Sequence, residues 1–87
     1  MQVSVRCFAG CKDVVGTSAF ELEMPDGATV GATLELLIKT YPGLEVYRNS
    51  LMLAVNREYA SLETALKQGD ELACIPPVSG GGAELNV

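Results

Sequence analysis

One stretch of this chain has the period of an amphipathic helix, and the segments on either side of it have the period of strands. Residues 29–41 place their apolar side chains on one helical stripe: Val30, Leu34, Leu37, Ile38 and Tyr41. Thr29 stands where an N-cap is expected, and Pro42 ends the pattern. A lone helix of this kind is expected to cover one face of a sheet.

Four segments are predicted to be strands. Apolar residues fall at period two in 2–8 and again in 19–24, and these segments are close enough to pair as a hairpin. The continuous apolar run 51–55 suits a central strand. The last strand, 71–75, ends at a Pro-Pro pair, because proline cannot donate to the hydrogen-bond ladder.

The remaining segments are predicted to connect these elements. Residues 10–17 break the strand pattern, and 43–50 are expected to be irregular or a short helical turn. Asn56 opens a turn toward Tyr59, and 62–66 form a short crossover.

The order strand, strand, helix, strand, crossover, strand predicts an α+β fold, the ubiquitin-like β-grasp. In this fold a mixed sheet of four to five strands packs on one main helix. A chain of 87 residues buries too little surface to be divided, so we expect one domain at 1–78. Residues 79–87 form a glycine-rich tail that we expect to be flexible.

The composition argues against several classes of function. The chain has no histidine, which removes the usual general base and the commonest metal ligand, so we expect no metal site and no bound cofactor. A formal charge of −5 disfavours nucleic acid and suits a partner with a basic surface. No apolar run is long enough to cross a membrane, and residues 1–6 alternate and lack the apolar run of a signal peptide, so we expect neither a membrane span nor a signal peptide.

The three cysteines do not form a CxxC motif, which favours a reducing, cytoplasmic location. Cys7 and Cys74 share the phase of the inward residues and are expected in the core. Cys11 is expected in a loop as an exposed thiol.

A triple glycine at 80–82 follows the Pro-Pro segment closely. Such a segment has no side chains, so it can thread a narrow channel and present a terminal carboxylate to another protein's active site. From Pro77 to Gly81 the chain reaches roughly 13–14 Å when fully extended. The alternative is a plain flexible linker with an inert end.

Three segments resemble the MoaD/ThiS family of ubiquitin-like sulfur carriers, in particular its molybdopterin synthase small subunits. They are 54–59 (Ala-Val-Asn-Arg-Glu-Tyr), 69–73 (Gly-Asp-Glu-Leu-Ala) and 76–81 (Pro-Pro-Val-Ser-Gly-Gly). The similarity extends more weakly through the first strand and the helix, so it covers residues 1–81.

The resemblance implies that Gly81, preceded by Gly80, is the working terminus of a sulfur carrier in molybdenum cofactor biosynthesis. A ubiquitin-activating-like adenylating enzyme would use ATP to activate the Gly81 carboxylate, and a sulfurtransferase would supply persulfide-derived sulfur. The resulting thiocarboxylate would enter the large molybdopterin synthase subunit and donate sulfur to cyclic pyranopterin monophosphate. The chain would thus be the sulfur-donor subunit of a heterotetrameric synthase and non-catalytic by itself.

The sequence departs from the family pattern after Gly81, because it continues to Val87. A tail-cleaving protease, a linker to a fused large subunit or an artefact of cloning would each explain residues 82–87, and we favour processing. Two other functions stay open: a sulfur carrier for the thiamine thiazole or another sulfur pathway, and a ubiquitin-like protein modifier. The long segment 29–50 and the Pro-Pro-Val-Ser-Gly-Gly end favour the molybdopterin pathway.

Strand phase predicts a docking face. Phe8 and Ile75 are out of phase with the inward residues of the first and last strands, which are neighbours in a β-grasp, so both should point outward. The alternative is that they cap the edge of the core or are scattered apolar residues of the surface. Tyr59 should lie nearby, and the matching family positions form the partner interface. The predicted partner-binding residues are Phe8, Tyr59, Ile75, Pro76, Pro77 and Val78.

Overall fold

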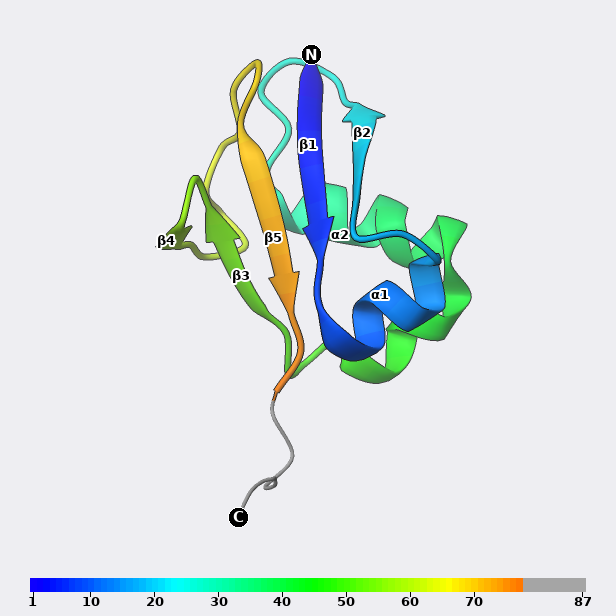
Figure 1. Ribbon diagram of the computed structural model, residues 1–87. Helices are drawn as coiled ribbons and strands as arrows, with labels where there is room; N and C mark the ends of the chain where they lie inside the picture. The colour runs from blue at the N-terminus through cyan, green and yellow to red at the C-terminus, as the bar shows by residue number, and fades with distance from the viewer. Residues whose placement is uncertain (78–87) are drawn as a thin grey trace.

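The computed structural model describes residues 1–77 and confirms the predicted α+β fold with a mixed sheet on one main helix (Figure 1). Five strands lie in the order β2-β1-β5-β3-β4 within this part of the chain. The strands are β1 (Gln2–Cys7), β2 (Ala19–Glu23), β3 (Met52–Val55), β4 (Glu58–Tyr59) and β5 (Glu71–Ile75). The helices are α1 (Ala9–Val15), α2 (Val30–Thr40) and the 3-10 helix η1 (Pro42–Tyr47).

The first and last strands are neighbours at the centre of the sheet, as predicted. Val5 lies opposite Leu72 in the parallel pair of β1 and β5, and opposite Phe20 in the antiparallel pair of β1 and β2. Leu53 of β3 lies opposite Cys74, so β5 is enclosed on both sides. The short strand β4 pairs with β3 at the edge.

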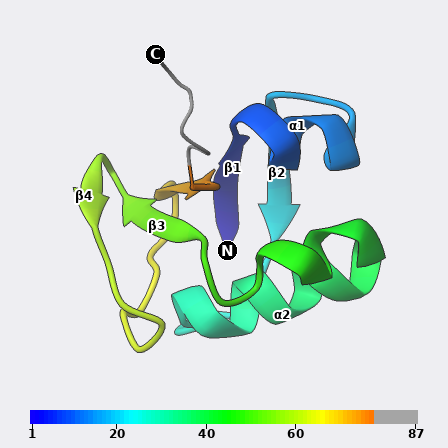
Figure 2. The same ribbon diagram turned by 90° about the horizontal axis from the view of Figure 1, so that it is seen from below.

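The main helix α2 begins where the sequence predicted. Its N-cap, Thr29, accepts a hydrogen bond from the backbone N–H of Ala32 through Oγ1 at 3.1 Å. Figure 2 shows α2 and η1 on one side of the sheet, with α1 beside the end of β1 and the start of β2. Buried apolar side chains fill the space between the sheet and α2: Val3, Val5, Val30, Leu34, Leu37, Ile38, Leu53, Leu72 and Cys74.

The segment 10–17, which was predicted to break the strand pattern and to connect two strands, contains most of the helix α1. Only Cys11 of this helix is fully buried and Val15 is partly buried, so the apolar stripe is too short to reveal the helix from the sequence. Gly10 also lowers its intrinsic helix propensity. Gly16 ends α1 with a left-handed φ of 92°, and its backbone N–H donates to the Lys12 carbonyl. The prediction that Cys11 is an exposed thiol is wrong, because α1 turns this side chain into the core.

Within residues 1–77, none of the helices has the length and apolar character that crossing a membrane requires.

Candidate functional site

The face of the sheet that points away from α2 has a groove along its centre. Ala73 of β5 lies beside Arg6 of β1 and opposite Ala54 of β3. Because the two alanines are small, the larger side chains around them enclose a hollow of about 330 Å³, which we call the outer groove. It is lined by Arg6, Phe8, Ala54, Arg57, Tyr59, Glu71, Ala73 and Ile75.

Three of the predicted docking residues line this groove together. Phe8 is 39% exposed, Tyr59 is 75% exposed, and Ile75 is half-buried. Strand phase thus placed Phe8 and Ile75 on the correct face of neighbouring strands. That a partner binds them stays a prediction.

Met52 enlarges the apolar surface and was missed by the sequence analysis. It lies opposite Ile75 in the pair of β3 and β5 and is 45% exposed. The run 51–55 is apolar throughout, so the sequence suggested that β3 is covered on both faces. Strand alternation could have found Met52, because the neighbour of the buried Leu53 points to the opposite face of the sheet.

Arg6 brings positive charge into the outer groove. Its guanidinium lies over the Phe8 ring, with Cζ 5.6 Å from the ring centroid. Its Nη1 is 3.4 Å from Glu71 Oε2. Its Nε is buried and has no hydrogen-bond partner among the described residues.

Arg57 reaches the same groove from the turn between β3 and β4. Asn56 and Arg57 have left-handed φ values of 51° and 72°, as the two central residues of a tight hairpin turn require. The exposed Arg57 side chain forms no ion pair with any residue in 1–77.

Hydrogen bonds hold this turn against the start of β5. Asn56 Nδ2 donates to Asp70 Oδ1 at 2.9 Å, and the backbone N–H of Glu71 donates to Asn56 Oδ1 at 3.0 Å. The backbone N–H of Lys67 donates to Asp70 Oδ2 at 2.8 Å. The hydrogen bond from Asn56 lowers the pKa of the buried Asp70 carboxyl, and the one from Lys67 adds to this.

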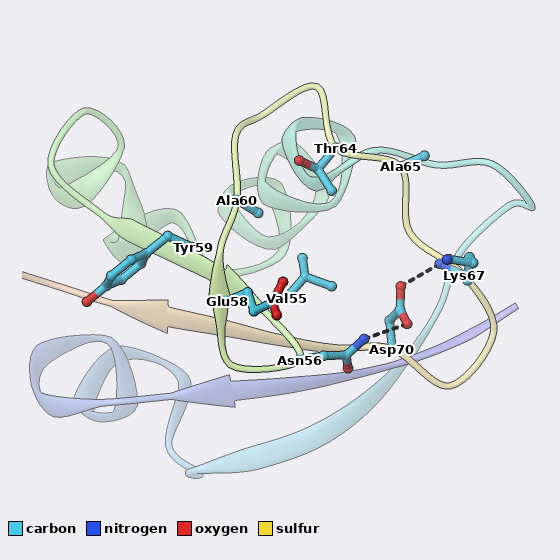
Figure 3. A pocket seen from close by; sticks show the side chains of 9 residues that line it. All are labelled: Val55, Asn56, Glu58, Tyr59, Ala60, Thr64, Ala65, Lys67 and Asp70. Carbon is cyan, nitrogen blue, oxygen red and sulfur yellow. Dashed lines mark hydrogen bonds between the residues drawn. The ribbon is translucent and has the colours of Figure 1, made fainter.

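A larger hollow, of about 410 Å³, lies on the other side of the β3–β4 hairpin (Figure 3). Asn56 and Asp70 line it, but both are committed to the hydrogen bonds of the turn. The Tyr59 ring points away from the other labelled side chains in Figure 3. We therefore regard the outer groove, and not this larger hollow, as the candidate site.

The outer groove lies next to the point where the chain leaves the sheet. β5 ends at Ile75, which lines the groove, and is followed by Pro76, which is buried, and Pro77, which is exposed. Pro76 therefore packs against the domain, and Pro77 is the proline that a partner could contact. The predicted site residues Val78, Gly80 and Gly81, and the tail 79–87, lie outside the described residues.

The three cysteines are not placed for chemistry. Burial raises the pKa of Cys74 to about 12 and that of Cys11 to about 11, with smaller contributions from neighbouring thiols, and burial also raises the pKa of Cys7. All three are therefore neutral thiols in the core near pH 7. Among residues 1–77 no group of three or more cysteine, aspartate or glutamate side chains is arranged to hold a metal ion.

Comparison with known proteins shows the family. The ThiS family model matches residues 5–81. The chain belongs to the ThiS family. A relative from Arabidopsis thaliana named molybdopterin synthase sulfur carrier subunit is 37% identical over 81 residues, which are 93% of this chain and 84% of the relative.

Solved structures agree with the fold. The small archaeal modifier protein SAMP1 from Haloferax volcanii is 33% identical, with a TM-score of 0.82 over 93% of this chain and 100% of that one. A chain from the complex of subunits 1 and 2 of the molybdopterin-converting factor of Helicobacter pylori is 27% identical, with a TM-score of 0.66 over 93% and 100%. The resemblance found in the sequence is thereby confirmed, and with it the expected role of sulfur carrier in molybdenum cofactor biosynthesis.

Proposed function

We propose that this sulfur carrier works through the carboxylate of Gly81 and docks on its partners through the outer groove. The observation that carries the proposal is the position of the groove, which combines Phe8, Tyr59 and Ile75 beside the exit of the C-terminal segment. The family match ends at residue 81, which supports Gly81 as the working terminus.

The chemistry proposed for Gly81 requires activation, because a free carboxylate is a poor acyl donor. An adenylating enzyme joins the carboxylate to the α-phosphate of ATP and releases pyrophosphate. The terminal sulfur of a persulfide on a sulfurtransferase then attacks the acyl adenylate and displaces AMP, which gives an acyl disulfide. A thiol reduces this disulfide, so the carrier is left with a thiocarboxylate and the thiols with a disulfide. In the large subunit, the thiocarboxylate sulfur bonds to cyclic pyranopterin monophosphate. Water then cleaves the acyl–sulfur bond, so the sulfur stays on the acceptor and the carrier returns to its carboxylate form. ATP is consumed by the activating enzyme, and the carrier itself needs no bound cofactor.

The short distance from the sheet to Gly81 constrains where a partner can bind. Gly81 is the fourth residue after Pro77, so the chain can span roughly 13–14 Å at most between them. A partner whose active site receives Gly81 must therefore lie against the end of β5 and over Ile75. The activating enzyme and the large subunit would then use the same face and bind one after the other.

The large subunit is the partner with the most support. The Helicobacter pylori structure that this chain resembles is a complex of two converting-factor subunits. We infer a matching complex here, with two carriers on a dimer of large subunits. We also retain the cytoplasmic location as a proposal, because free thiols in the core suit a reducing compartment.

Processing after Gly81 is the step that intact mass spectrometry tests most directly. We expect the carrier isolated from its own cells to end at Gly81, with a fraction heavier by the replacement of one oxygen by sulfur. A linker to a fused large subunit would instead appear as a much longer polypeptide. A full-length chain of 87 residues that supports molybdopterin formation without trimming would contradict the proposal.

A second function, as a ubiquitin-like protein modifier, is favoured by the similarity to SAMP1. The same activated Gly81 carboxylate would then be transferred to lysine amines of other proteins. Digests of cell extracts would carry Gly81 remnants on lysines if this function exists. A carrier for the thiamine thiazole has less support, since the relative described above is named for molybdopterin synthase.

A further inference from the structure

We propose that the partner places a carboxylate in the outer groove, between Arg6 and Arg57. This inference rests on the proposed function, and it specifies the chemistry of the large subunit's contact surface. The whole chain carries a charge of −5, which alone predicts a basic partner. The groove has the opposite local charge, because two arginines and one glutamate line it.

Arg6 is only partly neutralised in the free protein. Glu71 reaches one terminal nitrogen at 3.4 Å, which is long for a charge-assisted hydrogen bond. The Phe8 ring lies against the guanidinium. The Arg6 side chain is still 43% exposed, and within residues 1–77 its guanidinium donates only the Nη1 hydrogen bond to Glu71. The guanidinium is therefore held in place with hydrogen-bonding capacity to spare.

Arg57 supplies a second cation on a fixed support. The turn that carries it is held by the hydrogen bonds between Asn56 and Asp70 and from the backbone of Glu71. No acidic side chain within the described residues neutralises Arg57. An incoming carboxylate would gain from both arginines without displacing an existing strong ion pair.

The apolar walls indicate what kind of group carries that carboxylate. Phe8, Tyr59 and Ile75 surround the arginines, so the best occupant is an acidic side chain on a largely apolar protein surface. A free anion would leave these walls in water. In a two-fold contact between two copies of this chain, the same arginines would approach each other. Ile75 also lies two residues before Pro77, so a partner that receives the C-terminus covers the groove.

Charge-neutralising variants test this proposal. A carrier ending at Gly81 is titrated with the purified large molybdopterin synthase subunit at low and high salt. Arg57→Gln is expected to raise Kd by about tenfold at low salt and to weaken the salt dependence. Arg57→Lys keeps the charge and should recover most of the affinity. The matched control is Lys39→Gln, which removes one charge from α2 on the other side of the sheet and should change Kd by less than about twofold.

Reciprocal changes in the partner locate the carboxylate. Acidic residues on the large subunit's contact surface are changed to lysine, and one of these variants should bind Arg57→Glu more tightly than it binds the parent carrier. Equal affinity and equal salt dependence of the parent and Arg57→Gln would overturn the inference and leave the proposed function intact. Failure of the parent carrier to bind at all would overturn both. A salt-sensitive dimer of the carrier that Arg57→Gln abolishes would show that a second copy is the occupant, which also overturns the inference.

Discussion

Asn56 and Asp70 link the β3–β4 hairpin to the start of β5 through a 2.9 Å hydrogen bond from Nδ2 to Oδ1. The hairpin carries Arg57 and Tyr59, and both line the outer groove. The shape of the outer groove therefore depends on a hydrogen bond whose Asp70 acceptor does not line the groove.

Removing the Asp70 carboxylate should destabilise the domain. In Asp70→Ala, the side chain of Asn56 and the backbone N–H of Lys67 lose their acceptors. We expect the free energy of unfolding to fall by about 1–3 kcal/mol, as for other losses of buried hydrogen-bond partners. Urea denaturation measures this change. Asp13→Ala, at an exposed position of α1, is the control and should change stability by less than about 0.5 kcal/mol.

The lowered pKa of Asp70 should also make stability depend on pH. Its pKa in the folded protein lies below the ordinary value of 3.8. The ionised carboxylate therefore stabilises the fold above that value, and the contribution is lost as the pH falls through the lower, folded pKa. Melting curves of the parent and Asp70→Asn should differ most near pH 6 and should converge as the pH falls below 3.8. A difference that stays constant over this range would contradict the assignment.

The sequence was sufficient for the elements whose burial repeats with a regular period. The helix stripe that includes Leu34 and Leu37 predicted α2, and the alternation of Val3 and Val5 predicted β1. The order of these elements then placed β1 beside β5. The outward orientation of Phe8 and Ile75 followed from strand phase alone, because a strand that buries one face must expose the other.

The elements that were missed have too few buried residues to produce a period. The helix α1 buries only Cys11, and β4 has two residues, both exposed. The outer groove could not be predicted in full, because its cations come from separate segments. Arg6 and Arg57 line the same groove only because the sheet places β1 and β3 on the two sides of β5.

A charge placed in the apolar wall of the groove should weaken docking. Ile75→Asp is expected to raise Kd for the large subunit by about 10- to 100-fold. The reason is that binding would remove water from an unpaired carboxylate beside Phe8. Calorimetric titration measures Kd, and a thermal melt checks the fold. Val46→Asp is a matched control, since Val46 is 78% exposed on η1. If Val46→Asp weakens binding as much as Ile75→Asp does, docking does not use the groove.

Tyr59→Ala separates loss of docking from loss of the fold. Tyr59 is 75% exposed at the sheet edge, so truncation removes little packing. We expect the melting temperature to stay nearly unchanged while the affinity for the large subunit falls. An unchanged affinity would exclude Tyr59 from the interface.

The cysteine thiols should be unreactive in the native protein. Burial holds them as neutral thiols, with the pKa of Cys74 raised to about 12. Iodoacetamide at pH 8 should label the folded chain far more slowly than the urea-unfolded chain, which has three reactive sites. Rapid native labelling of Cys11 would show that α1 opens readily and would contradict its buried position.

The last prediction concerns Gly81, the proposed site of adenylation and sulfur transfer. In a carrier that ends at this residue, Gly81→Ala should fold normally, since Gly81 comes after the last strand in the sequence and glycine has no side chain to lose. Binding to the large subunit should also persist, because the groove is unaltered. The added methyl group should obstruct the narrow approach to both active sites and restrict backbone angles that glycine adopts freely. A displacement of about 1 Å at the reacting carbonyl could lower the rate on the order of 100-fold. The test measures thiocarboxylate yield and single-turnover sulfur transfer for Gly81→Ala and for the parent carrier, with thermal melts of both. Equal rates would show that sulfur transfer does not depend on the missing side chain at Gly81.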